Sequence, residues 1–265
     1  MIRDFADFAR EISLEAGSIL LRGFRSPKTV ISYKSKTDLV TDADRASEQY
    51  LVERISERFP DHTIIAEEGS RKEAAGDYIW YVDPLDGTNN YAHGLPFFCV
   101  SIGVYSIRRK QVVAAVVFNP FLDELFSATR GGGAFLDNNP ISVSLLDDIG
   151  VSLVATGFPY DKATSDSNNL KEFNRIVPRI QGIRRMGSAA IDLSYVACGR
   201  IDGYWEGKLK PWDMAAGSLI VEEAGGRVTT YTGGTFNPEF PEVVASNGRI
   251  HEQLISLLDE DCIQK

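Results

Sequence analysis

The chain has 265 residues, a net charge of -9 and a pI near 5.0, with 43% hydrophobic and 25% charged residues. Such a composition is ordinary for a globular protein with a sizeable core, and the acidic balance argues against a nucleic-acid-binding surface, which usually carries an excess of Lys and Arg. No apolar run reaches the length that a signal peptide or a membrane span requires, so we expect no membrane association.

The cysteines and the continuity of the chain bear on its location and its domain count. Cys99, Cys198 and Cys262 are odd in number and far apart, a pattern that fits neither a zinc site nor a disulfide framework. We therefore expect a soluble, cytoplasmic protein. No linker, repeat or low-complexity segment interrupts the sequence, so residues 1–265 are expected to form a single domain.

Two helices are predicted near the N-terminus. Residues 4–24 place apolar side chains at three- and four-residue steps, which is typical of an amphipathic helix. Polar residues 32–38 then predict a loop that contains Lys34 and Lys36. Thr41, followed by acids that include Asp44, is typical of a helix start, and this helix should extend to about residue 59. Capping alone would explain Asp44.

Carboxylates follow each of the next two predicted strands. Residues 63–66 form a short apolar strand that ends at Glu67 and Glu68, although these two acids could also be plain loop residues. Residues 78–82 are aromatic and β-branched, which predicts a buried strand, and Asp83-Pro84 should end it because proline donates no ladder hydrogen bond. The carboxyl ends of strands are where open α/β sheets bind their ligands.

The turn after this second strand combines acids with an anion-binding feature. Gly87 lets the backbone approach a ligand, and Thr88 can open a helical turn whose free N–H groups attract an anion. Asp83 and Asp86 would repel that anion unless a divalent cation lay between them. Hard oxygen ligands with a phosphate partner favour Mg²⁺. Taken alone, the same residues could be an ordinary turn.

A run of predicted strands follows. Residues 97–105, 111–118 and 124–128 have strand composition and are separated by turns, which indicates an antiparallel meander. The glycines at 131–133 resemble a phosphate-binding loop, but no helix follows them and the Lys-Ser/Thr pair is missing. We therefore favour a hairpin turn at this position.

The second half alternates strands with helices. Glu206 should lie at the end of a strand, and Asp213 should cap the helix that follows, a role that would explain Asp213 without any function. His62 and His251 are expected at the surface, and His93, just after the motif of residues 82–91, is expected either behind the site residues or in a loop. The expected elements are strand 151–156, loop 161–169, helix 170–180, helix 187–198 ended by Gly199, strand 201–206, helix 214–224, strands 227–231 and 243–246, and helix 250–258.

Taken together, four ordered segments resemble the inositol monophosphatase family, within the Mg²⁺-dependent, lithium-sensitive phosphatases that include the fructose-1,6-bisphosphatases. The resemblance covers nearly the whole chain and implies an α+β fold, a layered αβαβα sandwich of the inositol monophosphatase and fructose-1,6-bisphosphatase type. It also implies a homodimer, for which the strand after Gln111 and the helix at Gly187 are the expected interface. The segments are Asp38–Asp44, Ile65–Glu68, Val82–Tyr91, and Trp212–Gly217 continued by Glu223–Gly226.

The resemblance also implies a role for particular residues. Two or three Mg²⁺ ions per subunit would be bound by Glu67, Asp83, the Leu85 carbonyl, Asp86 and Asp213. Glu67 and Thr88 would orient the attacking water, with Asp44 hydrogen-bonded to Thr88, so these three form the expected catalytic set. The substrate would be bound by Asp86, Gly87, Thr88, Ala189 and Glu206.

The implied reaction is Mg²⁺-dependent hydrolysis of myo-inositol 1-phosphate, a small phosphorylated polyol, to myo-inositol and phosphate. Glu206 favours a polyol because a carboxylate accepts hydrogen bonds from hydroxyl groups. Relatives on the same scaffold hydrolyse fructose 1,6-bisphosphate, nucleotide phosphates or histidinol phosphate, so the substrate stays open. The sequence also departs from animal members at Asn89-Asn90 and at residues 206–211.

A function of another class is also open, because some bacterial members of the family bind the transcription machinery. Arg184-Arg185 and the basic turn at residues 108–110 would then be the contacts. Retention of every metal-binding acid favours the enzyme, since converging carboxylates repel one another and a pure binding protein has no physical reason to keep them.

Overall fold

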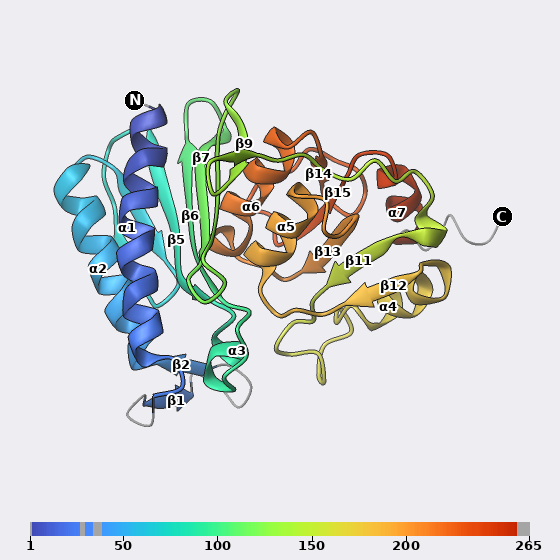
Figure 1. Cartoon of the computed structure of the whole chain (residues 1–265), viewed down its shortest axis with the longest axis horizontal. Coiled ribbons are helices and arrows are strands. Elements are labelled where there is room, and N and C mark those ends of the chain that lie inside the picture. The colour runs from blue at the N-terminus through green and yellow to red at the C-terminus, as the bar shows by residue number, and fades with distance from the viewer. Residues whose placement is uncertain (1, 27–29, 34–38, 259–265) are drawn as a thin grey trace.

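The computed structural model describes residues 2–26, 30–33 and 39–258; Pro27, Lys34, Lys36, Asp38 and Cys262 lie outside the described residues. Helices and sheets alternate in αβαβα layers, as the resemblance predicted (Figure 1). In order across the molecule, the helical layers are α1 (Ile2–Gly23) with α2 (Asp42–Arg58), then α5 (Ala189–Ala197) with α6 (Pro211–Glu223), and finally α4 (Leu170–Ile176) with α7 (His251–Leu258).

The first sheet has eight strands in the order β10-β9-β8-β7-β6-β5-β3-β4, and its neighbours run antiparallel except β3 and β5. The antiparallel meander predicted from the sequence is confirmed in β6, β7 and β8. Parallel pairing of Ala66 with Val82 brings the ends of β3 and β5 side by side, which places Glu67 beside Asp83. The strands are β3 (Thr63–Ala66), β4 (Arg71–Lys72), β5 (Tyr78–Asp86), β6 (Cys99–Ser106), β7 (Gln111–Asn119), β8 (Glu124–Thr129), β9 (Gly133–Leu136) and β10 (Asn139–Pro140).

Strand β5 does not end at Asp83-Pro84 as predicted. It continues to Asp86, and its pairing with β6 shifts register between Asp83 and Asp86. The irregularity accommodates the missing N–H of Pro84, because the ladder is locally disrupted at a bulge. It also changes the directions of the Asp83 and Asp86 side chains, so the bulge determines the local shape of the segment that carries them.

The second sheet has five strands in the order β12-β11-β13-β15-β14. Strand β12 was not predicted, and the helix expected over residues 170–180 divides into α4 and a 3-10 turn at Val177–Arg179, where Pro178 cannot continue the α-helical hydrogen bonding. The strands are β11 (Leu153–Thr156), β12 (Gly182–Arg184), β13 (Gly203–Gly207), β14 (Arg227–Thr229) and β15 (Glu242–Ser246).

Two paired strands and one short helix lie close to the end of the chain's first helical layer. The loop predicted from Ser32 is partly wrong, because β1 (Ile31–Tyr33) pairs with β2 (Leu39–Thr41). Residues 34–38 lie outside the described residues. The helical turn expected at Thr88 is confirmed as α3 (Thr88–Ala92).

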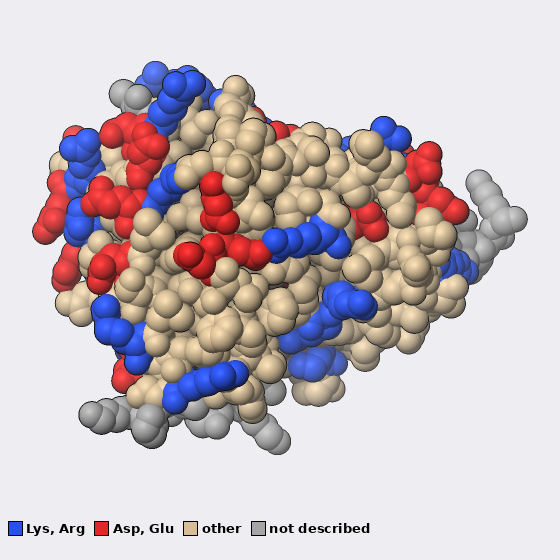
Figure 2. Space-filling view, viewed as in Figure 1, with Lys and Arg blue, Asp and Glu red and all other residues tan. Residues whose placement is uncertain are grey.

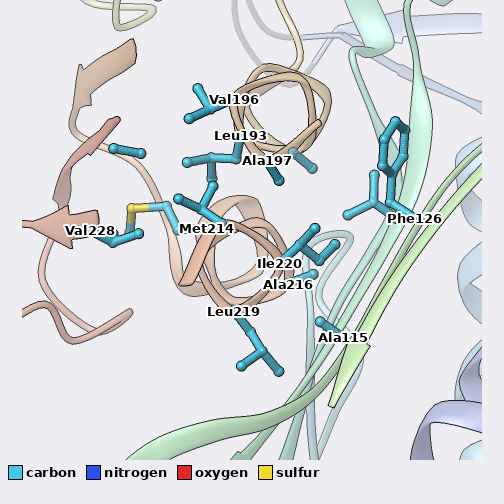
Figure 3. Close-up of a cluster of buried hydrophobic side chains, with 14 of the residues drawn as sticks. Ala115, Phe126, Leu193, Val196, Ala197, Met214, Ala216, Leu219, Ile220 and Val228 are labelled. Carbon is cyan, nitrogen blue, oxygen red and sulfur yellow. The ribbon is translucent and has the colours of Figure 1, made fainter. Parts of the chain in front are cut away.

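Helices α5 and α6 form the layer between the sheets, and they pack so closely that a glycine is required. A Cβ on Gly217 of α6 would lie 2.5 Å from the Cβ of Leu193 on α5. Figure 3 shows the side chains of both helices meeting Phe126 of the first sheet on one side and Val228 of the second sheet on the other. Each large aliphatic side chain buried here contributes about 1.5–3 kcal/mol, so this layer joins the two sheets.

Strand β7 and helix α5, which were expected in the homodimer interface, are covered by other elements of the same subunit. Strand β7 lies between α1 and α6, and α5 packs against α6, so both elements are buried within one subunit. The apolar composition of β7 correctly indicated that the strand packs against other elements. It could not show that these elements belong to the same subunit.

The structure contradicts the predictions for His62 and His251 and agrees with the prediction for His93. His62 is half-buried, stacks on Phe59 and accepts a hydrogen bond from Trp80 Nε1 at 3.0 Å. His251 is buried and bonded to Thr229 and Ser246. Both surface predictions are therefore wrong, because aromatic and hydroxyl partners from distant segments cover these rings. His93 is exposed after α3, as expected.

The triple-glycine segment is a hairpin turn between β8 and β9, as favoured from the sequence. Its amides are already bonded within the chain: the N–H groups of Gly131 and Gly133 donate to the Glu223 carboxylate at 2.9 and 3.0 Å. An internal carboxylate therefore takes the place that an anion would take in a phosphate-binding loop.

Charge is mixed over the outer helices. At the left of Figure 2, over α1 and α2, Lys and Arg side chains are interspersed with Asp and Glu. Several of these charges pair across the two helices, as Arg54 does with Glu11 and Arg58 with Asp4. Within the described residues, no helix is both long enough and apolar enough to cross a membrane.

Candidate active site

A cavity of about 530 Å³ opens where the end of β5 meets the N-termini of α5 and α6. Every site residue predicted from the sequence lines this cavity except Asp44. These lining residues are Glu67, Asp83, Leu85, Asp86, Gly87, Thr88, Ala189, Glu206 and Asp213. Residues that are distant in the sequence are thus brought into one site.

Four carboxylates share this cavity and disfavour one another's charge. Asp83 is 1% exposed, and burial, followed by the charges of Glu67, Asp86 and Asp213, holds its pKa well above the usual range. The pKa of Asp213 is raised well above its ordinary value by burial first and then by the charges of Asp86 and Glu67. Without a cation, a fully ionised cluster here would be strongly destabilising.

Protein donors fix one oxygen on each of the three aspartates. The Leu85 N–H donates to Asp83 Oδ1 at 3.0 Å, and the Lys210 N–H donates to Asp213 Oδ2 at 2.7 Å, which confirms the predicted capping role of Asp213. Asp86 Oδ2 accepts from the Ala190 N–H at 2.8 Å and from Ser188 Oγ at 2.7 Å. The carboxylates are therefore oriented by the fold before any ligand binds.

Asp86 is the least perturbed of these aspartates. Burial raises its pKa to about 6, while the hydrogen bonds from Ala190 and Ser188 act in the opposite direction. Ser188 was missed in the sequence. A signal was present, because a serine before a helix of small residues is a typical N-cap, and its Oγ does accept from the Ile191 N–H at 3.4 Å.

Asp44 combines the capping role with contact to the site. Its Oδ2 accepts from the Thr41 N–H at 2.9 Å, which caps α2, and its Oδ1 lies 3.2 Å from Thr88 Oγ1. Thr88 Oγ1 is also 3.0 Å from the Leu85 carbonyl oxygen. Burial raises the pKa of Asp44, and the hydrogen bonds from Thr41 and Thr88 oppose that shift. The capping role of Asp44 is therefore confirmed, and the hydrogen bond to Thr88 that the resemblance implied is present.

Gly87 is required at the turn between Asp86 and Thr88. Its φ is +95°, and a Cβ there would lie 2.7 Å from the Phe97 carbonyl oxygen. A side chain at this position would therefore be strained and would also clash with the backbone. The tight turn lets Thr88 begin α3 directly after the aspartates.

Glu206 lies on β13 and lines the cavity from the second sheet. Burial raises its pKa to about 7, and a hydrogen bond from the Tyr204 hydroxyl, at 2.5 Å, opposes the shift. A Cβ on Gly157 would lie 1.9 Å from Glu206 Oε2, so Gly157 makes room for this carboxylate. Tyr204 and Gly157 were missed, although residues two apart on a strand share a face and could have indicated Tyr204.

The donor set fits a hard divalent cation. Among the described residues, no three His, Cys, Asp or Glu side chains already converge on one point as a finished metal cage. The four carboxylates nevertheless share one cavity, and they disfavour one another's charge. Carboxylate and carbonyl oxygens without nitrogen or sulfur suit Mg²⁺, which keeps several waters and needs few protein ligands.

Comparison with known proteins gives consistent matches. The model of the inositol monophosphatase family matches residues 1–261. An inositol-1-monophosphatase from Synechocystis is 43% identical over 97% of this chain and 89% of its own length. The Nus factor SuhB of Escherichia coli is 39% identical over 93% of this chain and 92% of its own length. The structure of an inositol monophosphatase from Anabaena (Nostoc) superposes with a TM-score of 0.87, at 41% identity over 97% and 95% of the two chains.

The raised pKa of Glu206 predicts a pH-dependent stability of the metal-free protein. An unfolded glutamate ionises near pH 4.5, while folded Glu206 keeps its proton to about pH 7. Stability therefore falls as pH rises through this window, because the folded state binds more protons than the unfolded state. The free energy of unfolding of Glu206→Gln, relative to that of the wild type, should therefore increase by on the order of 2 kcal/mol between about pH 5 and about pH 8.

Urea denaturation in the presence of a chelator measures this difference. The comparison isolates Glu206, because the other cavity acids are present in both proteins and the Gln side-chain oxygen can still accept from Tyr204. A gap between the two unfolding free energies that is the same at both pH values would contradict a buried, protonated Glu206.

Proposed function

The chain belongs to the inositol monophosphatase family and is a phosphatase of phosphate monoesters, and we propose that its substrate is myo-inositol 1-phosphate. The observation that carries the proposal is the cavity itself. It joins four carboxylates and Thr88 on one side to the buried carboxylate of Glu206 on the other. The first group suits a phosphate with cations, and the second suits the hydroxyl groups of a polyol.

We propose Mg²⁺ as the cofactor, with two or three ions per subunit bound by Glu67, Asp83, the Leu85 carbonyl, Asp86 and Asp213. Support comes from the all-oxygen donor set and from the mutual repulsion that raises the pKa of Asp83. Bound Mg²⁺ supplies positive charge that polarises phosphoryl oxygens and makes water a better nucleophile at neutral pH.

The chain's own residues position the reactants. Asp44 orients the Thr88 hydroxyl, and Thr88 with Glu67 holds the attacking water for in-line displacement. The N–H groups of Gly87 and Thr88 bind the phosphate at the start of α3. These roles require only small movements, because the donors that orient the carboxylates are already in place.

The polyol is recognised by Asp86, Ala189 and Glu206. Ala189 lies at the first turn of α5, directly beside the Ala190 N–H that holds Asp86. A second phosphate on the substrate would approach half-buried Glu206, whose charge opposes an anion, but also Arg185, Lys208 and Lys210, which line the same cavity and attract one. A neutral polyol meets Glu206 without repulsion, and the substrate panel decides between an inositol monophosphate and fructose 1,6-bisphosphate.

A substrate panel tests the assignment. With Mg²⁺ present, kcat/KM should be highest for D- or L-myo-inositol 1-phosphate, and chelation should abolish phosphate release. Above about pH 7, where Glu206 is ionised, Glu206→Gln should lower kcat/KM for the inositol ester by about tenfold or more, because a charge-assisted hydrogen bond to the polyol is lost. Equal or higher kcat/KM for fructose 1,6-bisphosphate, a nucleotide phosphate or histidinol phosphate would overturn the substrate assignment.

Asp83→Asn tests the acid cluster. Turnover should fall by at least about a hundredfold, because a charged group that stabilises the transition state through the metal is lost. The metal-free fold should be as stable as the wild type or more so, since one repelling charge is removed while Asn Oδ1 can still accept from the Leu85 N–H.

Thermal melts with a chelator and phosphate-release assays report the two effects separately. Asp123→Asn, on the exposed turn between β7 and β8, is the matched control and should behave as the wild type in both. If Asp83→Asn melted several degrees below the wild type without metal, the idea of a repulsive acid cluster would be wrong.

A second function is suggested by the similarity to a protein named a Nus factor. Arg184 and Arg185 are exposed, as is the turn at residues 108–110, so both stretches are free to contact a partner. Mg²⁺-dependent turnover that is unaffected by Arg184→Ala, together with lost binding to a transcription complex, would support both roles; Arg185 is left unchanged because it lines the cavity. Turnover of none of the phosphate esters would leave protein binding as the main function.

The homodimer and the cytoplasmic location stay predictions. A dimer interface must use surfaces other than β7 and α5, which are buried within the subunit. Light scattering at micromolar concentration measures the assembly directly, and a monomer mass would contradict the dimer.

A further inference from the structure

One face of α2 contacts the three segments that supply the predicted catalytic groups. Asp44, Ser47 and Glu48 are spaced three and four residues apart, so they share that face. Asp44 contacts Thr88, and Ser47 Oγ donates to the Pro84 carbonyl oxygen at 3.1 Å. Glu48 accepts hydrogen bonds from the turn after Glu67. Neither Ser47 nor Glu48 lines the cavity.

Glu48 makes the most specific of these contacts. Its side chain is 3% exposed, its Oε2 accepts from the Glu68 N–H at 2.7 Å, and its Oε1 accepts from the Ser70 N–H at 3.0 Å. Hydrogen bonds to an ionised acceptor are shorter and stronger than neutral ones. A single carboxylate thus closes the turn by binding two of its amides.

The tip of the turn is exposed at Gly69. Gly69 adopts a φ of +105°, and a Cβ there would meet no atom within 4 Å apart from its chain neighbours. On the strand side, the Glu67 N–H donates to the Val82 carbonyl at 3.2 Å, and the Ala66 N–H donates to the Ser70 carbonyl at 3.0 Å. Glu67 is therefore held by β5 on one side and, through the next peptide, by Glu48 on the other.

We propose that Glu48 is a positioning residue that fixes Glu67 relative to Asp83 and so sets the affinity of the site for Mg²⁺, with Ser47 holding the Pro84 segment in the same way. The proposal rests on the proposed function in so far as Glu67 and Asp83 bind the metal. Groups that orient metal ligands typically change metal affinity or activity by about 10- to 100-fold when removed.

Glu48→Gln tests the proposal with little change in shape. An amide presents only one acceptor oxygen, so its NH₂ group would face either the Glu68 or the Ser70 N–H, and one of the two bonds is lost. We expect the Kd for Mg²⁺, measured by calorimetry without substrate, to rise by about tenfold. Hydrogen exchange at the Glu68 and Ser70 amides should become faster, while KM for substrate at saturating Mg²⁺ should stay unchanged.

Two further variants complete the experiment. Glu57→Gln, an exposed glutamate on the same helix, should match the wild type in all three measurements. Ser47→Ala should weaken Mg²⁺ binding by a few-fold and leave exchange at Glu68 and Ser70 unchanged, because it releases only the Pro84 carbonyl. Ser47→Ala also keeps the proposal testable if a Glu48 variant folds poorly.

The outcomes are distinct. If Glu48→Gln lowered the melting temperature but left the Kd for Mg²⁺ and the exchange of both amides unchanged, Glu48 would serve stability alone and the proposal would be overturned. Calorimetry and exchange need no substrate. A wild type that binds Mg²⁺ but does not hydrolyse inositol 1-phosphate would therefore refute the proposed function while still giving a clear result for Glu48.

Discussion

The repulsion among Glu67, Asp83, Asp86 and Asp213 is the constraint on which the rest of the structure depends. A chain gains nothing in folding free energy by bringing four like charges together in one cavity, so the fold must supply the compensation. It does so with backbone N–H groups and a hydroxyl aimed at individual carboxylate oxygens, and with the irregular end of β5, which turns Asp83 and Asp86 toward the cavity. The negative charge that these donors leave uncompensated can be neutralised by a bound cation.

The site is shared between the layers of the fold, and no single element could provide it. Strand β5 contributes two aspartates, the first turns of α5 and α6 contribute Ala189 and Asp213, and β13 of the second sheet contributes Glu206. Because α5 and α6 pack between both sheets, the separation of Asp86 from Glu206 is set by the thickness of that helical layer. Gly217, where α5 and α6 pack against each other within that layer, does not line the cavity.

Much of the fold and of the site could be predicted from local pattern and motif resemblance, and what could not be predicted depends on tertiary pairing. Apolar and β-branched composition predicted most strands, and capping chemistry predicted the start of α2, whereas α6 begins at Pro211, three residues before its expected start. The pairing of β3 with β5, which brings Glu67 to Asp83, is set by register and leaves no local trace. Ser188, Tyr204 and Glu48 matter only because distant segments approach them. His251 was misplaced for the same reason, since its hydroxyl partners come from two strands of the second sheet.

Helix α6 carries a hydrogen-bonded carboxylate at each end. Asp213 in its first turn accepts from the Lys210 N–H, and Glu223 at its last residue accepts from the hairpin amides of Gly131 and Gly133. An acid at a helix C-terminus opposes the helix dipole, so its bonds to the hairpin and to Arg130 compensate an otherwise unfavourable placement. The bond to Lys210 is local to the N-terminus of α6, so the bonds of Glu223 to the hairpin are the ones that would break if the helix moved along its axis. Its length, rather than only its packing, then defines how far Asp213 extends into the cavity.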